Sequence, residues 1–367
     1  MKVLVVGAGL SGMVLATALK RTGSAVELIE LHPAWQVLGV GISVQGPALR
    51  ALKAIGLLEA CIAAGFGYSQ VVNCDQNGKV QGVVELPRLN GAQYPACVGM
   101  MRPALHDVVA GAIRDAGVAV RFGTTVRALS ATGDVEFSDG VRASYDLVVG
   151  ADGANSRIRE LLRGPQAKPL YTGQAVWRAM VPRPPEVKAR HAYYGPRHKA
   201  GFNPVSQTEM YIYLVQNVQG NPRLEPARWP ALMRELLADF GGHIGAVRER
   251  IIDPERIVYR PVGSLLLPPP WYQGRVVLIG DAAHTAPPQL ASGATIAIED
   301  AIVLAELLAA MPVDEALARF MARRYERCRI VVENSWQLGE WEKTPDAPGA
   351  DATALIQASM KALAAPI

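Results

Sequence analysis

Three short segments of the chain combine glycines with polar side chains in patterns that can hold a charged ligand. The first is Gly7-Ala8-Gly9-Leu10-Ser11-Gly12, which follows an apolar run and precedes an Ala/Leu-rich stretch. Glycines at this spacing allow a tight turn, a close approach of the backbone to a diphosphate and close packing of the next helix. The free N–H groups at that helix start then bind the phosphates.

The elements around this first segment support a dinucleotide site. The sequence predicts strands over 2–6 and 25–30 on either side of a helix over 10–21, with Glu30 at the end of the second strand. A carboxylate there accepts hydrogen bonds from a ribose hydroxyl and argues against a 2′-phosphate, hence against NADP at this site. A plain glycine-rich turn is the alternative, but the order of strand, helix, strand and acid favours dinucleotide binding.

The second segment, Gly150-Ala151-Asp152-Gly153-Ala154-Asn155-Ser156-Arg157-Ile158-Arg159, also follows a predicted strand. Taken alone, it is better explained as a surface turn in which Asp152 or Ser156 caps the following helix. It gains a functional meaning only together with the other two segments.

The third segment is Gly280-Asp281-Ala282-Ala283-His284, which comes after a predicted strand and before two prolines. An aspartate at a strand end can accept hydrogen bonds from a polyol chain. The following Gly293-Ala294-Thr295 opens a helix, whose start stabilises a developing negative charge. For His284 itself the sequence favours a satisfied position in the core.

Around these segments, α/β elements flank a middle part that is rich in strands. We expect helices over 48–64, 103–116, 229–240, 296–311 and 313–341, and strands over 118–122, 134–137, 146–149, 174–181, 190–194, 209–216, 256–267 and 275–279. The residues of 229–240 with helical spacing form the buried stripe of that helix. The fold class is therefore α/β with an α+β insert, in which separated segments build the nucleotide-binding domain.

Composition excludes several classes of protein. With 367 residues, 50% of them hydrophobic and 19% charged, the chain is globular and has room for about two domains. We expect a cytoplasmic protein without a membrane span or signal peptide, because no apolar stretch is long enough. Basic residues form no long run, which argues against nucleic acid. The four cysteines (Cys61, Cys74, Cys97 and Cys328) are scattered, so neither a zinc site nor a disulfide framework is expected.

The three segments, in this order, resemble the class A flavoprotein monooxygenases, the p-hydroxybenzoate hydroxylase-like family of FAD-dependent aromatic hydroxylases. Asp152, Gly153, Ser156 and Arg159 fill the family's D-G-x-x-S-x-x-R pattern, and residues 280–284 fill its G-D-A-A-H pattern. Arg102 looks like the R-x-x-L arginine that reaches the FAD. The resemblance covers roughly residues 1–335 and implies a Rossmann-like FAD-binding domain, a β-sheet-rich substrate domain and C-terminal helices.

The resemblance also implies domain limits and cofactor contacts. The FAD-binding domain would comprise 1–70, 98–172 and 268–335, the substrate domain 71–97 and 173–267, and the helix end and tail 336–367. The residues implied to bind FAD are Gly7, Gly9, Leu10, Ser11, Gly12, Glu30, Gly41, Arg102, Val126, Asp152, Asp281, Gly293, Ala294 and Thr295. Of these, Val126 belongs to a strand that touches the adenine through its backbone, and Gly41 to the loop beside the isoalloxazine.

One segment departs from the family. Ala291-Ser292-Gly293-Ala294-Thr295 stands where relatives often have G-Q-G-x-N, so Thr295 replaces a side-chain amide. One glycine and the helix start remain for backbone contacts to the flavin N1–C2 edge.

The substrate pocket is less strongly defined by the sequence. Tyr211 and Tyr213 share one strand face, where they can contact an aromatic ring or simply pack. Pro288 and Gln289 are the candidates for positions at the reactive edge of the flavin, and Gln289 or Gln45 can orient a polar group. The basic stretch 178–199 predicts either solvated sheet edges or a carboxylate clamp. No residue is distinguished as a catalytic base.

The leading hypothesis is an enzyme that hydroxylates an aromatic or N-heteroaromatic small molecule. By resemblance, NADPH or NADH reduces the FAD as a transient reductant, O₂ adds at C4a, and the resulting flavin C4a-hydroperoxide delivers one oxygen atom. A related epoxidase, oxidative decarboxylase or reductase is the alternative within enzymes. A non-catalytic flavin- or ligand-binding regulatory protein is the alternative outside them, favoured only by the altered 291–295 loop. The sequence does not decide between a monomer and a homodimer or between NADH and NADPH, and it does not identify the substrate.

Overall fold

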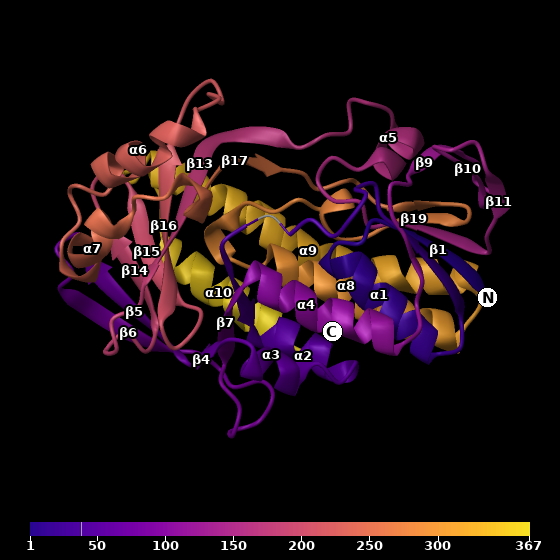
Figure 1. The fold of residues 1–367 in the computed structure, drawn as a ribbon, viewed down its shortest axis with the longest axis horizontal. Helices are drawn as coiled ribbons and strands as arrows, with labels where there is room; N and C mark the ends of the chain where they lie inside the picture. The colour runs from indigo at the N-terminus through magenta and orange to yellow at the C-terminus, as the bar shows by residue number, and fades with distance from the viewer. Residues whose placement is uncertain (38) are drawn as a thin grey trace.

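The first unit of the fold is built on a mainly parallel sheet. The computed structural model describes residues 1–37 and 39–367. The sheet has the order β18-β19-β12-β1-β2-β8, and β1 pairs in parallel with both β2 and β12. Its strands are β1 (Lys2–Val6), β2 (Ala25–Ile29), β8 (Val120–Arg121), β12 (Leu147–Gly150), β18 (Tyr272–Gln273) and β19 (Val276–Leu278). Helices lie on one side of this sheet and a small three-stranded sheet lies on the other (Figure 1), so both faces are covered, which is why β1 is a continuous apolar run.

Helices and two small sheets complete this unit. Its helices are α1 (Leu10–Arg21), α2 (Gly46–Ala54), α3 (Leu58–Ala63), α4 (Arg102–Asp115), α5 (Arg157–Arg163), α8 (Gly293–Ala310), α9 (Val313–Lys343) and α10 (Ala352–Ala364). One small sheet joins β3 (Gly41–Gln45), β7 (Cys97–Met101) and β4 (Phe66–Tyr68); the other joins β9 (Val126–Leu129), β10 (Asp134–Phe137) and β11 (Arg142–Ser144). Helix α8 packs against α1, α2 and α9, and so lies at the centre of the unit.

The second unit is a seven-stranded sheet with the order β17-β13-β16-β15-β14-β5-β6. Its strands are β5 (Gln70–Asp75), β6 (Val80–Glu85), β13 (Leu170–Pro182), β14 (Arg190–Tyr194), β15 (Lys199–Pro204), β16 (Glu209–Asn217) and β17 (Ile257–Ser264). Figure 1 shows the short helices α6 (Trp229–Leu236) and α7 (Gly242–Val247) on the outer side of this sheet.

The two faces of strand β16 contact different parts of the protein. Met210, Ile212 and Leu214 are fully buried and pack with the apolar side chains of α6 and α7. Each such buried side chain contributes about 1.5–3 kcal/mol through the removal of its apolar surface from water. The alternate residues point to the other face, toward the first unit. This confirms the alternation that the sequence predicts for the strand.

The structure corrects one predicted helix and adds several elements that the sequence patterns did not predict, among them β3, β5, β6, β7, β15 and α10. The predicted single helix 48–64 is wrong: it is divided into α2 and α3, because Gly56 adopts a φ of 68° between them. The C-terminal tail forms α10, which docks on α9 through hydrogen bonds from Arg327 to the carbonyls of Ala362 and Leu363. Within the described residues, we find no helix with the length and apolarity needed to cross a bilayer.

Candidate functional site

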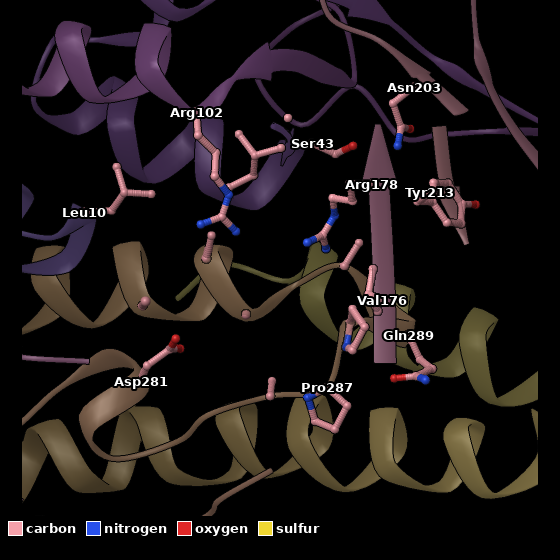
Figure 2. A pocket seen from close by; sticks show the side chains of 18 of the residues that line it. Leu10, Ser43, Arg102, Val176, Arg178, Asn203, Tyr213, Asp281, Pro287 and Gln289 are labelled. Carbon is pink, nitrogen blue, oxygen red and sulfur yellow. The ribbon is translucent and has the colours of Figure 1, made fainter. Parts of the chain in front are cut away.

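A cavity of about 380 Å³ lies between the two units. Residues of all three glycine-containing segments line one end, and four strands of the seven-stranded sheet line the other. Figure 2 shows Arg102, Arg178 and Asp281 extending their charged groups into the space between them, with Asn203 and Tyr213 at the sheet. The fold therefore brings together segments that are far apart in the chain.

The first segment forms an open cradle at the start of α1. A Cβ atom on Gly7, which has a φ of 102°, would lie 2.6 Å from the carbonyl oxygen of Ala151, and one on Gly12 would lie 1.9 Å from that of Gly7. These two glycines are thus required by the packing of the turn. Gly9 differs, since nothing lies within 4 Å of a Cβ placed there, and it lines the cavity with Leu10 and Ser11.

Two charged groups face each other across this end of the cavity. Arg102 stands at the start of α4, and its side chain passes so close to Gly39 that a Cβ there would lie 2.5 Å from Arg102 Cδ. Asp281 follows β19. Burial raises the pKa of Asp281, and the nearby charges of His284 and Arg102 partly offset this. Asp281 can accept hydrogen bonds from hydroxyl groups, while Arg102 can bind an anionic or carbonyl oxygen.

The start of α8 also opens into the cavity, through Gly293 and Ala294. Thr295 does not line it, because its side chain is buried beneath the helix start. We therefore expect Thr295 to contact the cofactor only through its backbone. The N–H groups of this helix start favour a negative charge in front of them.

Two acids predicted at the cofactor site already have partners in the protein. Glu30 accepts hydrogen bonds from the backbone N–H of Ala8 at 2.9 Å and of His32 at 3.0 Å, so its carboxylate is fixed beside the glycine turn. Asp152 accepts from the N–H groups of Arg157 and Ile158, at 2.7 and 3.1 Å.

Asp152 thus has the structural role that its segment suggested as the alternative, and its contact with the cofactor stays a prediction. Its carboxylate also accepts the hydroxyl of Ser156 at 2.5 Å, and it holds the start of α5, the alternative that this segment suggested. Ser156 is the N-cap of that helix. Val126 begins β9 and is 1% exposed, so only its backbone is placed for a contact.

At the other end, four strands present one continuous face to the cavity. The strand register places Arg178 beside Tyr213 and Asn203 beside Tyr211. Gly201 pairs with Tyr213, and a Cβ on Gly201 would lie 2.4 Å from the tyrosine hydroxyl. The phenol ring of Tyr213 thus occupies the space that a side chain at position 201 would need.

The two tyrosines share this face, as the sequence predicts. Tyr211 packs on β3, since a Cβ on Gly41 would lie 2.1 Å from its Cδ1. Its ring centroid is 6.5 Å from that of Tyr213. Both side chains are largely buried yet line the cavity, so the contacts available to a ligand are ring edges and the Tyr213 hydroxyl.

Sequence reasoning missed Glu342, which the last turn of α9 places in the cavity wall. It accepts hydrogen bonds from Lys199 Nζ at 3.2 Å and from Gln289 Nε2 at 3.0 Å. Burial lowers the pKa of Lys199, but Glu342 outweighs it and the net pKa is raised. Nothing local in a helix rich in exposed charges distinguishes this glutamate, so no sequence signal was available.

Of the remaining candidates, Pro288 and Gln289 line the cavity and Gln45 does not. Gln45 donates to the carbonyl of Leu290 at 3.0 Å and accepts the hydroxyl of Ser292 at 2.9 Å. Its amide thus fixes the loop before α8 and is not free to orient a ligand. The structure therefore shows Gln45 as a residue that positions the loop, and its orienting of a ligand stays a prediction.

A buried ionic cluster supports the third segment from behind. Asp300 accepts hydrogen bonds from Gly280 N at 2.9 Å and Arg324 Nε at 2.7 Å, and its carboxylate is 2.5 Å from His284 Nε2. Burial raises the pKa of Asp300, but His284 and Arg324 outweigh this and lower it to about 2. His284 is thus a partnered core residue, as expected, and the cluster ties the loop to α8 and α9.

These features fit an FAD molecule. Gly9 leaves open space at the start of α1, the start of α8 faces the same cavity, and Arg102 and Asp281 provide one cationic and one anionic contact. A diphosphate, a negatively charged ring edge and a polyol chain are the groups that such contacts hold.

Comparison with known proteins agrees with this geometry. Residues 1–337 match a family model described as FAD binding domain. The 2-heptyl-3-hydroxy-4(1H)-quinolone synthase of Pseudomonas aeruginosa is 31% identical over 354 residues, which cover 93% of this chain and 90% of that protein. The 6-hydroxynicotinate 3-monooxygenase of Pseudomonas fluorescens is 32% identical over 361 residues, or 91% of each chain.

The chain belongs to the FAD-dependent monooxygenases. The same fold occurs in an Arg-to-Gln variant of the Klebsiella pneumoniae protein HpxO complexed with FAD, with a TM-score of 0.84 and 23% identity over 99% of this chain and 94% of that chain. Like the named relatives, this monooxygenase is a flavoprotein oxidoreductase. The face with Arg178 and Tyr213 and the contact of Glu342 are parts of the cavity wall that the motifs alone do not define.

Proposed function

We propose that this monooxygenase inserts one oxygen atom from O₂ into an aromatic or N-heteroaromatic small molecule, with NADH or NADPH as electron donor. The observation that carries the proposal is the single cavity shared by the cofactor cradle and the tyrosine-bearing sheet face. Relatives whose names denote ring-hydroxylating activity, such as 6-hydroxynicotinate 3-monooxygenase, support this class of reaction.

In this proposal, the two units have separate tasks. Segments 1–70, 98–172 and 268–335 hold the FAD, which supplies electron transfer and oxygen activation when bound. Segments 71–97 and 173–267 hold the ring. Gly9, Leu10 and Ser11 bind the diphosphate through the helix start, Asp281 binds the polyol, and Arg102 and the start of α8 bind the flavin edge. A cytoplasmic location, where NADH and NADPH are available, suits this assignment.

The protein's own contribution to the reaction is positioning and exclusion of water. Tyr211 and Tyr213 bound the ring site laterally, and Pro287 and Pro288 form the wall next to the loop before α8. A closed, water-poor site protects the reactive oxygen species from unproductive decay. Gln289, whose amide is held by Glu342 and by Gln174 at 2.8 Å, has a fixed orientation toward the ring.

A direct experiment tests this function. Purified protein is loaded with FAD, and NADH and NADPH oxidation and O₂ uptake are measured with a panel of phenols, hydroxybenzoates, anilines and hydroxypyridines. The proposal requires consumption that one ring compound stimulates, together with a product heavier by one oxygen atom in mass spectrometry. Unstimulated traces across the panel, with FAD firmly bound, would instead support a flavin-binding regulatory protein.

A further inference from the structure

The substrate end of the cavity carries more positive than negative charge. Arg178, Arg190 and Lys199 line it, and Glu342 is the one acidic side chain that lines it in the described part of the chain. Glu342 pairs with Lys199 at 3.2 Å. Among residues 1–37 and 39–367, no carboxylate forms an ion pair with Arg178 or Arg190. Two guanidinium charges therefore remain without a counter-charge.

Both arginines are partly buried in the wall of the cavity. Arg190 lies on β14 with its guanidinium 5.9 Å from the ring centroid of Tyr213, and its Nε is buried without a hydrogen-bond partner among the described residues. Arg178 projects from β13 toward Arg102, as Figure 2 shows. Burial lowers the pKa of Arg178, with a further lowering by Arg102. Two guanidinium groups that face the cavity without a carboxylate partner favour an anionic ligand.

The polar atoms beside these charges indicate which hydrogen-bonding groups the ligand carries. Three further side-chain atoms are buried without a partner in the described structure: Asn203 Oδ1, Gln289 Oε1 and the hydroxyl of Tyr213. The first two are acceptors and need a donor from the ligand, whereas the hydroxyl can donate. A ligand that satisfies this end thus has an anionic group and an O–H or ring N–H group.

From these contacts we infer that the substrate is a ring carboxylate bearing a hydroxyl or ring N–H group, with its carboxylate held between Arg178 and Arg190. The inference rests on the proposed function and narrows its substrate class. It separates two kinds of relative by the compounds in their names: 6-hydroxynicotinate is such a carboxylate, whereas 2-heptyl-3-hydroxy-4(1H)-quinolone has no carboxylate. Bidentate guanidinium–carboxylate pairing fixes both the position and the orientation of the ring.

Matched ring pairs test the inference on the FAD-loaded protein. The probes are 6-hydroxynicotinate against 2-hydroxypyridine and 4-hydroxybenzoate against phenol, which differ only in the carboxylate. Dissociation constants come from the change in flavin absorbance and fluorescence on titration. We expect at least one carboxylate to bind more than about tenfold more tightly than its neutral partner, the size of one charge-assisted hydrogen bond.

Arginine variants locate the effect. Arg178→Gln and Arg190→Gln should each weaken carboxylate binding about 10- to 100-fold and change binding of the neutral ring less than about threefold. Arg190→Lys should restore part of the loss. The control is Arg228→Gln, an exposed arginine outside the cavity lining, which should change neither. Circular dichroism and bound FAD show that each variant is folded.

Several results would overturn the inference. One is that the carboxylate and neutral members of each pair bind equally well, and another is that no carboxylate binds. A third is that the arginine variants lose affinity for the carboxylate and the neutral ring to the same extent. If the arginine variants lose affinity for FAD but bind the carboxylate as before, the arginines bind the cofactor and not the substrate. Carboxylate binding that depends on the arginines but yields no oxygenated product would contradict the proposed function alone, and the anion site would stand.

Discussion

Lys199 and Glu342 form an ion pair of 3.2 Å that joins the sheet of one unit to the last turn of α9 from the other. The pair lies in the wall of the cavity, with side chains only 15% and 20% exposed. It has two consequences. It neutralises one of the three cations at the substrate end, and it fixes the amide of Gln289, which donates to the same carboxylate.

The first prediction concerns the loss of this pair. Glu342→Gln leaves the Lys199 ammonium without its counter-charge in a mostly buried place, and should lower the free energy of unfolding by on the order of 1–3 kcal/mol. Glu333→Gln, on the exposed face of the same helix and paired with Arg329, should cost less than about 1 kcal/mol. Denaturant unfolding measures both, and equal losses would show that the cavity pair behaves like a surface pair.

The second prediction separates two glycines of the first segment. Gly9→Val should leave the fold intact, because no atom lies within 4 Å of a Cβ at that position, but should weaken FAD binding more than about tenfold. Gly12→Ala should instead lower the melting temperature, since its Cβ would lie 1.9 Å from the carbonyl oxygen of Gly7. Flavin absorbance after gel filtration and thermal melts check the two effects. Unchanged flavin retention in Gly9→Val would place the cofactor elsewhere.

The third prediction separates two aspartates. Asp152→Ala removes the acceptor for two N–H groups at the start of α5 and should destabilise the protein by about 1–2 kcal/mol, with FAD affinity unchanged in the folded protein. Asp281→Asn should weaken FAD binding and leave the stability of the protein nearly unchanged, because the carboxylate of Asp281 faces the cavity. Melting temperatures and FAD titrations form the test. A large drop in FAD affinity for Asp152→Ala, without loss of stability, would support the cofactor role that the motif implied.

The fourth prediction is a pH dependence of stability from the buried cluster. Burial lowers the pKa of His284, but Cys328 and the Asp300 carboxylate outweigh it, and the net pKa is well above the ordinary 6.5. A raised pKa stabilises the fold fully below 6.5, and this gain is lost as the pH rises through the folded value. Asp300, with a pKa lowered from 3.8 to about 2, contributes stability above 3.8 that is lost as the pH falls toward 2.

The pair therefore stabilises most between the ordinary pKa values of its two members. The difference in melting temperature between the native protein and His284→Gln should be largest near about pH 5 and should shrink as the pH rises beyond about 7. His32→Gln, at an exposed position, is the control and should show a constant difference. A difference for His284→Gln that grows with rising pH would mean that this histidine is buried in its neutral form. If His284→Gln fails to fold, the decline in stability of the native protein above about pH 7 remains measurable by urea unfolding.

The sequence by itself determined the FAD fold and most of its cradle. The segments at Gly7, Asp152 and Asp281 carry their meaning locally, because a glycine turn, a helix cap and a strand-end acid depend on neighbouring residues. For the same reason the alternation of β16 predicts which side chains share a face with Tyr211. The sequence alone did not separate residues that contact the cofactor from residues that stabilise the fold, since Asp152 holds the start of α5.

Only the tertiary structure decided the substrate end. Arg178, Arg190 and Tyr213 meet there through the register of separate strands, and Gly201 makes room for a ring from its neighbour. Glu342 arrives from the end of a helix whose sequence pattern gives no sign of a site, and Gln45 is turned away to hold a loop. The physical reason is that such contacts depend on strand register and on packing between separate segments, whereas local patterns specify only the elements themselves.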